Sequence, residues 1–214
     1  MKTISFISQK GGVGKTTLAI HLAVAFAADG LNVAILDLDP QASAAEWKDF
    51  REEEMPGVIA IPSSRLPKVL NELENRGADA VILDTAPHSE GTALDAARVA
   101  DLILVPCQPS IMDLRAMRKT TDLLRHIKKP TYAVLNGVSV QGSAALGTEK
   151  AIAAEFKIDI CPVRMGDRVA YSRCLISGHS AQEYEPEGKA AREAHKFHKW
   201  VSGLVGLSSK KAAA

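Results

Sequence analysis

The chain has 214 residues, of which 46% are hydrophobic and 24% charged, and its formal net charge is +1. These values are ordinary for one soluble globular domain, and a charge so near zero argues against binding a polyanion through global charge. No apolar run approaches the ~20 residues that a membrane-spanning helix needs, and the N-terminus enters a strand pattern without a secretion signal. The three cysteines are widely spaced and form no C-x-x-C pair, so we expect neither disulfides nor a metal or cluster site in a cytoplasmic protein.

In chain order, apolar β-rich runs predict strands near residues 3–8, 32–37, 57–61, 79–84, 101–106, 131–136 and 158–161. Helical patterns fill the intervals, at 15–29, 42–54, 64–76, 89–99, 111–128, 144–156, 168–177 and 187–205. This alternation is typical of a single α/β domain with a mainly parallel twisted β-sheet flanked by helices on both faces. We expect the domain to span residues 1–207 and residues 208–214 to form a disordered tail.

The first predicted strand runs into QKGGVGKTT, residues 9–17, which opens the first helix. Glycines there let backbone N–H groups wrap a phosphate at the positive end of the helix. Lys15 is placed to reach the terminal phosphates and the Thr16 hydroxyl to ligate Mg²⁺, so the segment predicts a P-loop that binds a nucleoside triphosphate. A glycine-rich turn with an incidental lysine is the alternative. The expected nucleotide-binding residues are Gly11, Gly12, Val13, Gly14, Lys15, Thr16 and Thr17.

The loop departs from the standard pattern, because Gln9 occupies a glycine position and Lys10 follows it. This K-G-G-x-G-K-T form resembles the deviant Walker A loop of the ParA/MinD group of ATPases. The segments LDLDPQ (36–41) and VILDTAP (81–87) resemble two further motifs of that group, closest to short ParA-type partition proteins. The resemblance implies an ATP-dependent homodimer in which Lys10 crosses the interface to the partner's nucleotide and takes part in catalysis. A solvated loop lysine is the alternative.

Three aspartates lie at or just beyond the ends of predicted strands. Asp39 lies just beyond a carboxyl end, where it could orient the attacking water or merely cap the next helix; the resemblance favours the catalytic role. Asp37 is expected to support Mg²⁺ through water or a hydrogen bond, and Asp84 has the form of a Walker B aspartate that holds Mg²⁺ through its waters. Asn136 lies where this family places an asparagine against adenine, although a turn residue fits as well.

Cations concentrate in the C-terminal part of the chain, and any polyanion would meet them there. The resemblance implies a surface that binds double-stranded DNA without sequence preference, through phosphate neutralisation. A solvated basic face is the alternative. The candidate DNA-binding residues are Arg164, Arg168, Arg173, Lys196 and Lys199.

The same C-terminal helix also fits an interfacial membrane anchor, because apolar residues share one of its faces and lysines flank it. These residues are Phe197, Trp200, Val201, Leu204 and Leu207. The need for this helix to cover the sheet argues against the anchor.

The function predicted from the sequence is segregation of a plasmid or chromosome by a nucleoid-associated, Mg²⁺-dependent ATPase. It would hydrolyse ATP to ADP and phosphate, weakly until a ParB-like centromere-binding or cargo-adaptor protein stimulates it. ATP would favour a homodimer that binds DNA, and hydrolysis would release it. A ParA-like positioning ATPase for a protein cargo and a MinD-like membrane-associated spatial regulator are the alternatives.

Overall fold

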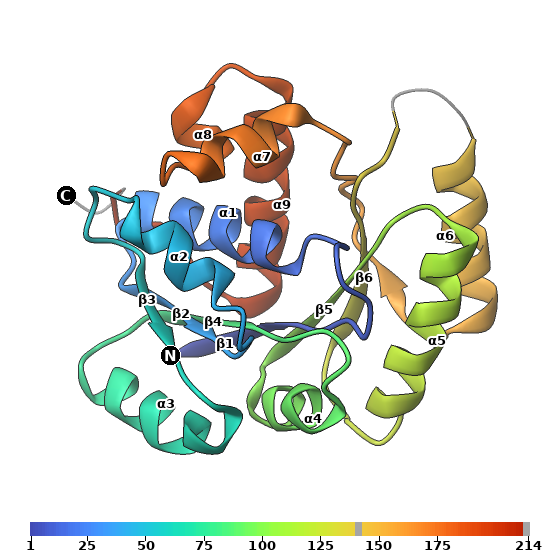
Figure 1. The fold of residues 1–214 in the computed structure, drawn as a ribbon, viewed down its shortest axis with the longest axis horizontal. Coiled ribbons are helices and arrows are strands. Elements are labelled where there is room, and N and C mark those ends of the chain that lie inside the picture. The colour runs from blue at the N-terminus through green and yellow to red at the C-terminus, as the bar shows by residue number, and fades with distance from the viewer. Residues whose placement is uncertain (140–142, 212–214) are drawn as a thin grey trace.

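Seven parallel strands form one twisted sheet in the order β3-β2-β4-β1-β5-β6-β7 (Figure 1). The computed structural model describes residues 1–139 and 143–211. The strands are β1 (Lys2–Phe6), β2 (Val33–Asp37), β3 (Gly57–Ala60), β4 (Ala80–Asp84), β5 (Leu102–Cys107), β6 (Thr131–Leu135) and β7 (Asp159–Ile160). All seven coincide with predicted strands to within two residues at either end, so the predicted fold class is confirmed.

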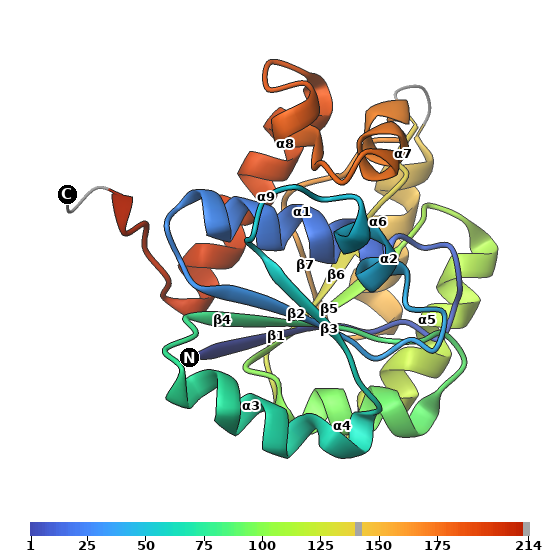
Figure 2. The same ribbon diagram turned by 60° about the vertical axis from the view of Figure 1, so that its left-hand side comes forward.

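Helices cover both faces of the sheet (Figure 2). One face carries α1 (Lys15–Ala28), α2 (Ser43–Asp49), α7 (Val169–Ile176), α8 (Ala181–Tyr184) and α9 (Lys189–Val205). The other carries α3 (Leu66–Asn75), α4 (Glu90–Val99), α5 (Ile111–Leu124) and α6 (Ala144–Glu155). Successive strand residues such as Val81 and Ile82 enter opposite hydrophobic cores, as expected of strands that are buried on both sides.

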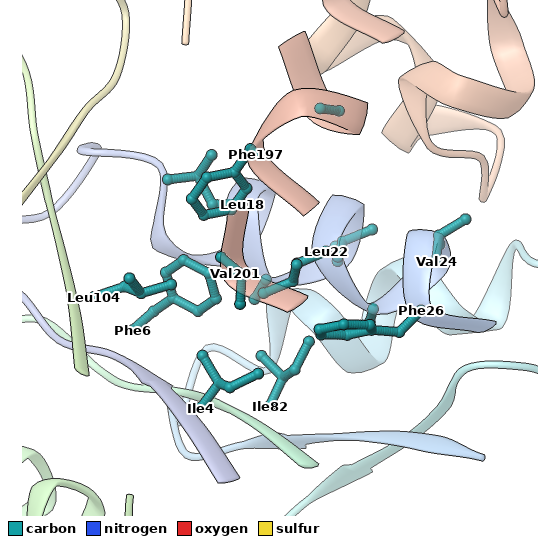
Figure 3. Close-up of a cluster of buried hydrophobic side chains, with 14 of the residues drawn as sticks. Ile4, Phe6, Leu18, Leu22, Val24, Phe26, Ile82, Leu104, Phe197 and Val201 are labelled. Atoms are coloured by element: carbon teal, nitrogen blue, oxygen red, sulfur yellow. The ribbon is translucent and has the colours of Figure 1, made fainter. Parts of the chain in front are cut away.

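Helix α9 lies on α1 and closes the larger core (Figure 3). Phe197 and Val201 are 1% and 0% exposed, and the Phe197 ring centroid lies 6.5 Å from that of Phe6 in β1. Trp200 and Leu207 pack against the same core, whereas Leu204 is 41% exposed. The membrane-anchor alternative is wrong for this face, because four of its five apolar side chains are used to cover the sheet. None of the described helices is long and apolar enough to cross a membrane.

Helix α2 ends at Asp49, although the sequence pattern predicts a helix as far as residue 54. The chain turns there because Arg51 donates from Nη1 to the Gly178 carbonyl at 3.0 Å and forms an ion pair with Glu183 at 2.7 Å. Lys48 Nζ also donates to the carbonyls of Glu53 and Glu54. Helix α5 likewise ends at Leu124 instead of residue 128.

The short helix α8 was missed, although the sequence carries its start signal. Ser180 and Glu183 have the spacing of a capping box, and the Ser180 N–H donates to the Glu183 carboxylate at 2.7 Å. At the C-terminus, Lys210 pairs with Asp79 at 2.7 Å and its N–H donates to the Asp29 carbonyl. Residues 212–214 of the predicted tail lie outside the described residues, and the boundary at residue 207 stays a prediction.

Candidate functional site

The loop between β1 and α1 has the backbone shape of a phosphate cradle. Gly12 and Gly14 have φ angles of 73° and 93°, in the left-handed region that favours glycine. A Cβ on Gly14 would lie 2.1 Å from the Asn136 amide nitrogen, whereas one on Gly12 would meet nothing within 4 Å. Gly14 is the N-cap of α1, and no described side chain caps this helix, so its first N–H groups remain available to an anion.

Lys15 extends along the inside of this loop. Its side chain is 6% exposed, and Nζ donates to the Lys10 carbonyl at 3.2 Å. Burial lowers the pKa of Lys15, while the negative charges of Asp84 and Asp39 raise it. A lysine that lies among carboxylates at the N-terminus of a helix is well placed to bind a multiply charged phosphate.

The three predicted aspartates converge because β2 and β4 are neighbours, with Asp37 opposite Asp84 in the register. The Asp37 carboxylate accepts three backbone N–H bonds, from Asp39 at 3.0 Å, Ala44 at 2.9 Å and Ala45 at 3.2 Å. Burial raises the pKa of Asp37 and these bonds lower it. Asp37 therefore satisfies the N-terminus of α2 from the preceding strand.

Asp39 does not take that capping role. Its Oδ1 accepts from the N–H of Gln41 at 3.0 Å, which closes a turn between β2 and α2. The side chain is half-buried at the same sheet edge as Lys15. The alternative in which Asp39 caps the helix is wrong, since Asp37 bonds the first N–H groups of α2 instead.

Asp84 is the most unusual carboxylate of the site. It is 1% exposed, and neither oxygen accepts a hydrogen bond of normal geometry from the described residues. Burial, with repulsion from Asp37 and Asp39, raises the pKa of Asp84 to about 7, against the opposing effects of Thr16 and Lys15. A buried, unpaired carboxylate next to a threonine hydroxyl fits Mg²⁺, which prefers oxygen ligands and retains several waters.

Protein side chains alone do not complete a metal site. Among residues 1–139 and 143–211, no group of three or more His, Cys, Asp or Glu side chains could hold a metal ion. Mg²⁺ at this place would therefore take ligands from phosphate and water as well as from the protein, which is its usual behaviour with nucleotides.

Lys10 forms an ion pair within its own chain. Its Nζ lies 2.5 Å from Oδ2 of Asp113 in the first turn of α5, and the two side chains are 34% and 1% exposed. The alternative of a solvated loop lysine is wrong in this structure. Asp113 is not among the predicted site residues. The signal in the sequence is its Ser-x-x-Asp spacing from Ser110, whose Oγ accepts the Asp113 N–H at 3.1 Å.

Two further contacts join the phosphate loop to neighbouring elements. Asn136 Nδ2 donates to the Val13 carbonyl at 2.8 Å, and Gln108 Nε2 donates to the Gly12 carbonyl at 3.2 Å. Asn136 thus braces the loop through its side chain, and its contact with adenine stays a prediction.

The candidate DNA-binding cations differ in their surroundings. Arg164 forms a bidentate pair with Glu149, with both distances 2.6 Å, and Arg168 pairs with Glu193 at 2.7 Å. Arg173 on α7 and both Lys196 and Lys199 on α9 are exposed. Two of the five cations are therefore largely neutralised by carboxylates of the same chain.

Helix α9 carries a more uniform basic surface than the five predicted residues. Glu193 is its only acidic residue, and this carboxylate is turned toward Arg168. Four exposed cations follow one another at helical spacing, and we name them the α9 stripe: Lys189, Arg192, Lys196 and Lys199.

The chain is similar to known nucleotide-binding proteins. The model of the CobQ/CobB/MinD/ParA nucleotide-binding domain matches residues 4–180. The maintenance of carboxysome distribution protein A of Gloeobacter kilaueensis is 35% identical over 121 residues, which cover 56% of this chain and only 55% of that protein. Protein ParA of Rhizobium radiobacter is 26% identical, over 90% of this chain and 92% of that one.

Comparison with solved structures agrees with the fold. The septum site-determining protein MinD of Pyrococcus horikoshii, solved in complex with Mg-ADP, superposes with a TM-score of 0.77 at 21% identity. The match covers 98% of this chain and 99% of the other. With the domain model covering most of the sequence, from β1 to Ser180, the chain belongs to the family of CobQ/CobB/MinD/ParA nucleotide-binding domains.

Proposed function

We propose that the protein is a ParA-type ATPase that hydrolyses ATP to ADP and phosphate with Mg²⁺. The observation that carries this proposal is the meeting of a glycine phosphate cradle, a buried Lys15 and the unpaired carboxylate of Asp84 at one edge of the sheet. Mg²⁺, when bound, would neutralise charge on the phosphate oxygens.

Each residue of the site has a distinct part in this proposal. Residues 11–17 bind the phosphates through backbone N–H groups, and Lys15 reaches the terminal ones. Thr16 and Asp84 hold Mg²⁺, the latter through water, and Asp37 supports them while it fixes the start of α2. Asp39, held by its turn, orients the attacking water.

Two copies of the chain would close on each other at this edge in the presence of ATP. Exposed apolar side chains support a protein contact here, because such a patch rarely stays in water on a monomer. Phe50 and Ile176 line a hollow with Thr16 and Thr17, and Ile111 and Met112 open the helix that holds Asp113. The five most exposed large apolar side chains of the described residues are Phe50, Ile111, Met112, Val169 and Ile176, at 60–77%.

In the dimer, Lys10 of one subunit would neutralise charge on the nucleotide of the other. A cation supplied across an interface accelerates GTP hydrolysis by ~10³–10⁵ in other phosphate-loop proteins, so an isolated subunit should be a slow ATPase. A partner protein, ParB-like or a cargo adaptor, would stimulate hydrolysis.

The α9 stripe and Arg173 support nonspecific binding of duplex DNA, which depends on phosphate neutralisation. DNA binding in the ATP state would make the protein nucleoid-associated and suit it to segregate a plasmid or chromosome. The name of the Gloeobacter relative favours a second candidate, the distribution of a protein cargo over the nucleoid, which needs the same ATP and DNA cycle with another partner.

The test is binding of duplex DNA with ATP, with ADP and without nucleotide at two salt concentrations. Lys15→Ala should abolish ATP-dependent binding, and Asp39→Ala should preserve or prolong it. The double variant Lys196→Gln/Lys199→Gln should weaken binding and reduce its salt dependence by ~1.8 logarithmic units per decade of salt if both residues contact phosphates. Lys128→Gln/Lys129→Gln, which removes the same charge after α5, is the matched control. If ATP dimerises the protein and no form binds DNA, the DNA proposal fails.

A further inference from the structure

Lys10 is held by its own subunit through a buried acidic group. Asp113 lies in the first turn of α5, and its side chain is 1% exposed, yet it reaches Lys10 Nζ at 2.5 Å. The two residues are 103 positions apart in the chain, so the contact depends on the packing of α5 against the phosphate loop. A charge-assisted bond at this distance is among the stronger polar contacts in proteins.

Asp113 is supported independently of Lys10. The Ser110 hydroxyl donates to Oδ2 and the Gln108 N–H donates to Oδ1 at 3.3 Å. Helix α5 is itself fixed to the loop, since the Gln9 N–H donates to Thr120 Oγ1 at 3.1 Å in a buried contact. The carboxylate therefore keeps its position and two neutral donors when the lysine leaves it.

One ammonium group cannot serve Asp113 and a phosphate of another subunit at the same time. We propose that Asp113 is the positioning residue for Lys10, retaining this lysine in its own subunit until the phosphates of a second subunit's nucleotide replace the carboxylate as its partner. The inference rests on the proposed function, in which Lys10 acts across the dimer.

The exchange is costly for Asp113, which loses a cation while it remains buried. Only a site with more negative charge than one carboxylate would draw Lys10 away, and a nucleoside triphosphate is such a site. Releasing Lys10 from Asp113 thus adds a free-energy cost to dimer formation, and removing the charge of Asp113 should reduce this cost.

The experiment compares Asp113→Asn with the wild type and with Asp122→Asn, a matched control on the same helix whose exposed carboxylate pairs with Arg125. The first measurement is acetylation of the Lys10 amine by an amine-reactive ester, followed by mass spectrometry without nucleotide. The second is the dimer dissociation constant with a non-hydrolysable ATP analogue, from sedimentation velocity. Asp113→Glu, which keeps the charge, should return both values toward those of the wild type.

For Asp113→Asn we expect Lys10 to be labelled at least tenfold faster and the dimer to form at least about tenfold more tightly, since a hydrogen bond to a charged group contributes that much. Asp122→Asn should match the wild type in both. The inference is overturned if Asp113→Asn, with a wild-type melting curve, leaves Lys10 labelling unchanged or does not strengthen the dimer. If Asp113→Asn does not fold, Asp113→Glu is the deciding variant. Labelling of Lys10 in Asp113→Glu at tenfold or more above the wild-type rate would also overturn the inference. Full ATPase activity in Lys10→Ala would refute the proposed action across the dimer instead, and the labelling result would still report on the ion pair.

Discussion

Replacing Asp84 by asparagine should stabilise the protein while it disables the metal site. The Asp84 side chain is 1% exposed and its oxygens accept no hydrogen bond of normal geometry from the described residues. Burial and the neighbouring aspartates raise its pKa from 3.8 to about 7, so holding the carboxylate ionised costs folding free energy. Asparagine has nearly the same shape and carries no charge.

The magnitude follows from linkage between protonation and folding. A carboxyl group whose pKa is raised in the folded state contributes stability below its unfolded pKa, near 3.8, and this contribution is lost as the pH rises to about 7. At 1.36 kcal/mol for each pKa unit, the full loss is about 4 kcal/mol above pH 7. Asp84→Asn should therefore be more stable than the wild type by up to about 4 kcal/mol at pH 7.5, and the difference should shrink toward zero near pH 4.

The assay is urea denaturation without nucleotide or Mg²⁺ at pH 4.5, 6.0 and 7.5, monitored by tryptophan fluorescence. Asp122→Asn, at an exposed position of α5, is the control and should show no comparable pH-dependent gain. The variant should also lose Mg²⁺-dependent ATP hydrolysis. An Asp84→Asn protein that is no more stable than the wild type at pH 7.5, or whose gain is the same at every pH, would refute the electrostatic argument.

Four other substitutions test different parts of the structure. Gly14→Ala should lose nucleotide binding and about 1–3 kcal/mol of stability in thermal unfolding. The reason is that φ at this residue is 93° and the new Cβ would lie 2.1 Å from Asn136 Nδ2. Nucleotide binding at the wild-type level would contradict this. Burial lowers the pKa of His21 to about 4, so neutral His21 contributes stability above pH 6.5 that is lost as the pH falls to 4. In urea denaturation the wild type should lose about 3 kcal/mol more stability than His21→Gln over that interval. An equal loss in both proteins would argue against this. Phe197→Ala should lower the free energy of unfolding by about 3–5 kcal/mol, and Leu204→Ala, at an exposed position, by about 1 kcal/mol or less. Neither should change co-sedimentation with lipid vesicles. Equal losses would contradict the burial of Phe197 on α9.

The strands and the phosphate loop could be predicted from local pattern alone. Runs such as VAILD and AVILD are apolar throughout because parallel strands covered on both faces leave no side exposed. The loop glycines precede a helix directly, so their left-handed φ angles follow from the sequence context. The meeting of Asp37, Asp39 and Asp84 was likewise predictable, since carboxyl ends of parallel strands share one sheet edge.

Which of these aspartates bonds the start of α2 and which closes the turn after β2 could not be predicted. The sequence offered Asp39 as the residue that could cap α2, but the path of the turn after β2 brings Asp37 to the N–H groups of Ala44 and Ala45. The end of α2 was equally non-local, since Arg51 leaves the helix for contacts with Gly178 and Glu183, more than 120 positions away.

The sequence by itself determined the fold class, the family and the chemical types at the site, because those depend on residues close together in the chain. Only the tertiary structure decided which charges are paired: Lys10 with Asp113, Arg164 with Glu149 and Arg168 with Glu193. It also decided that the apolar face of α9 is buried against α1 and the sheet. The physical reason is that periodicity reports how one segment meets water or a core, whereas an ion pair or a buried contact depends on where packing brings a second, distant segment.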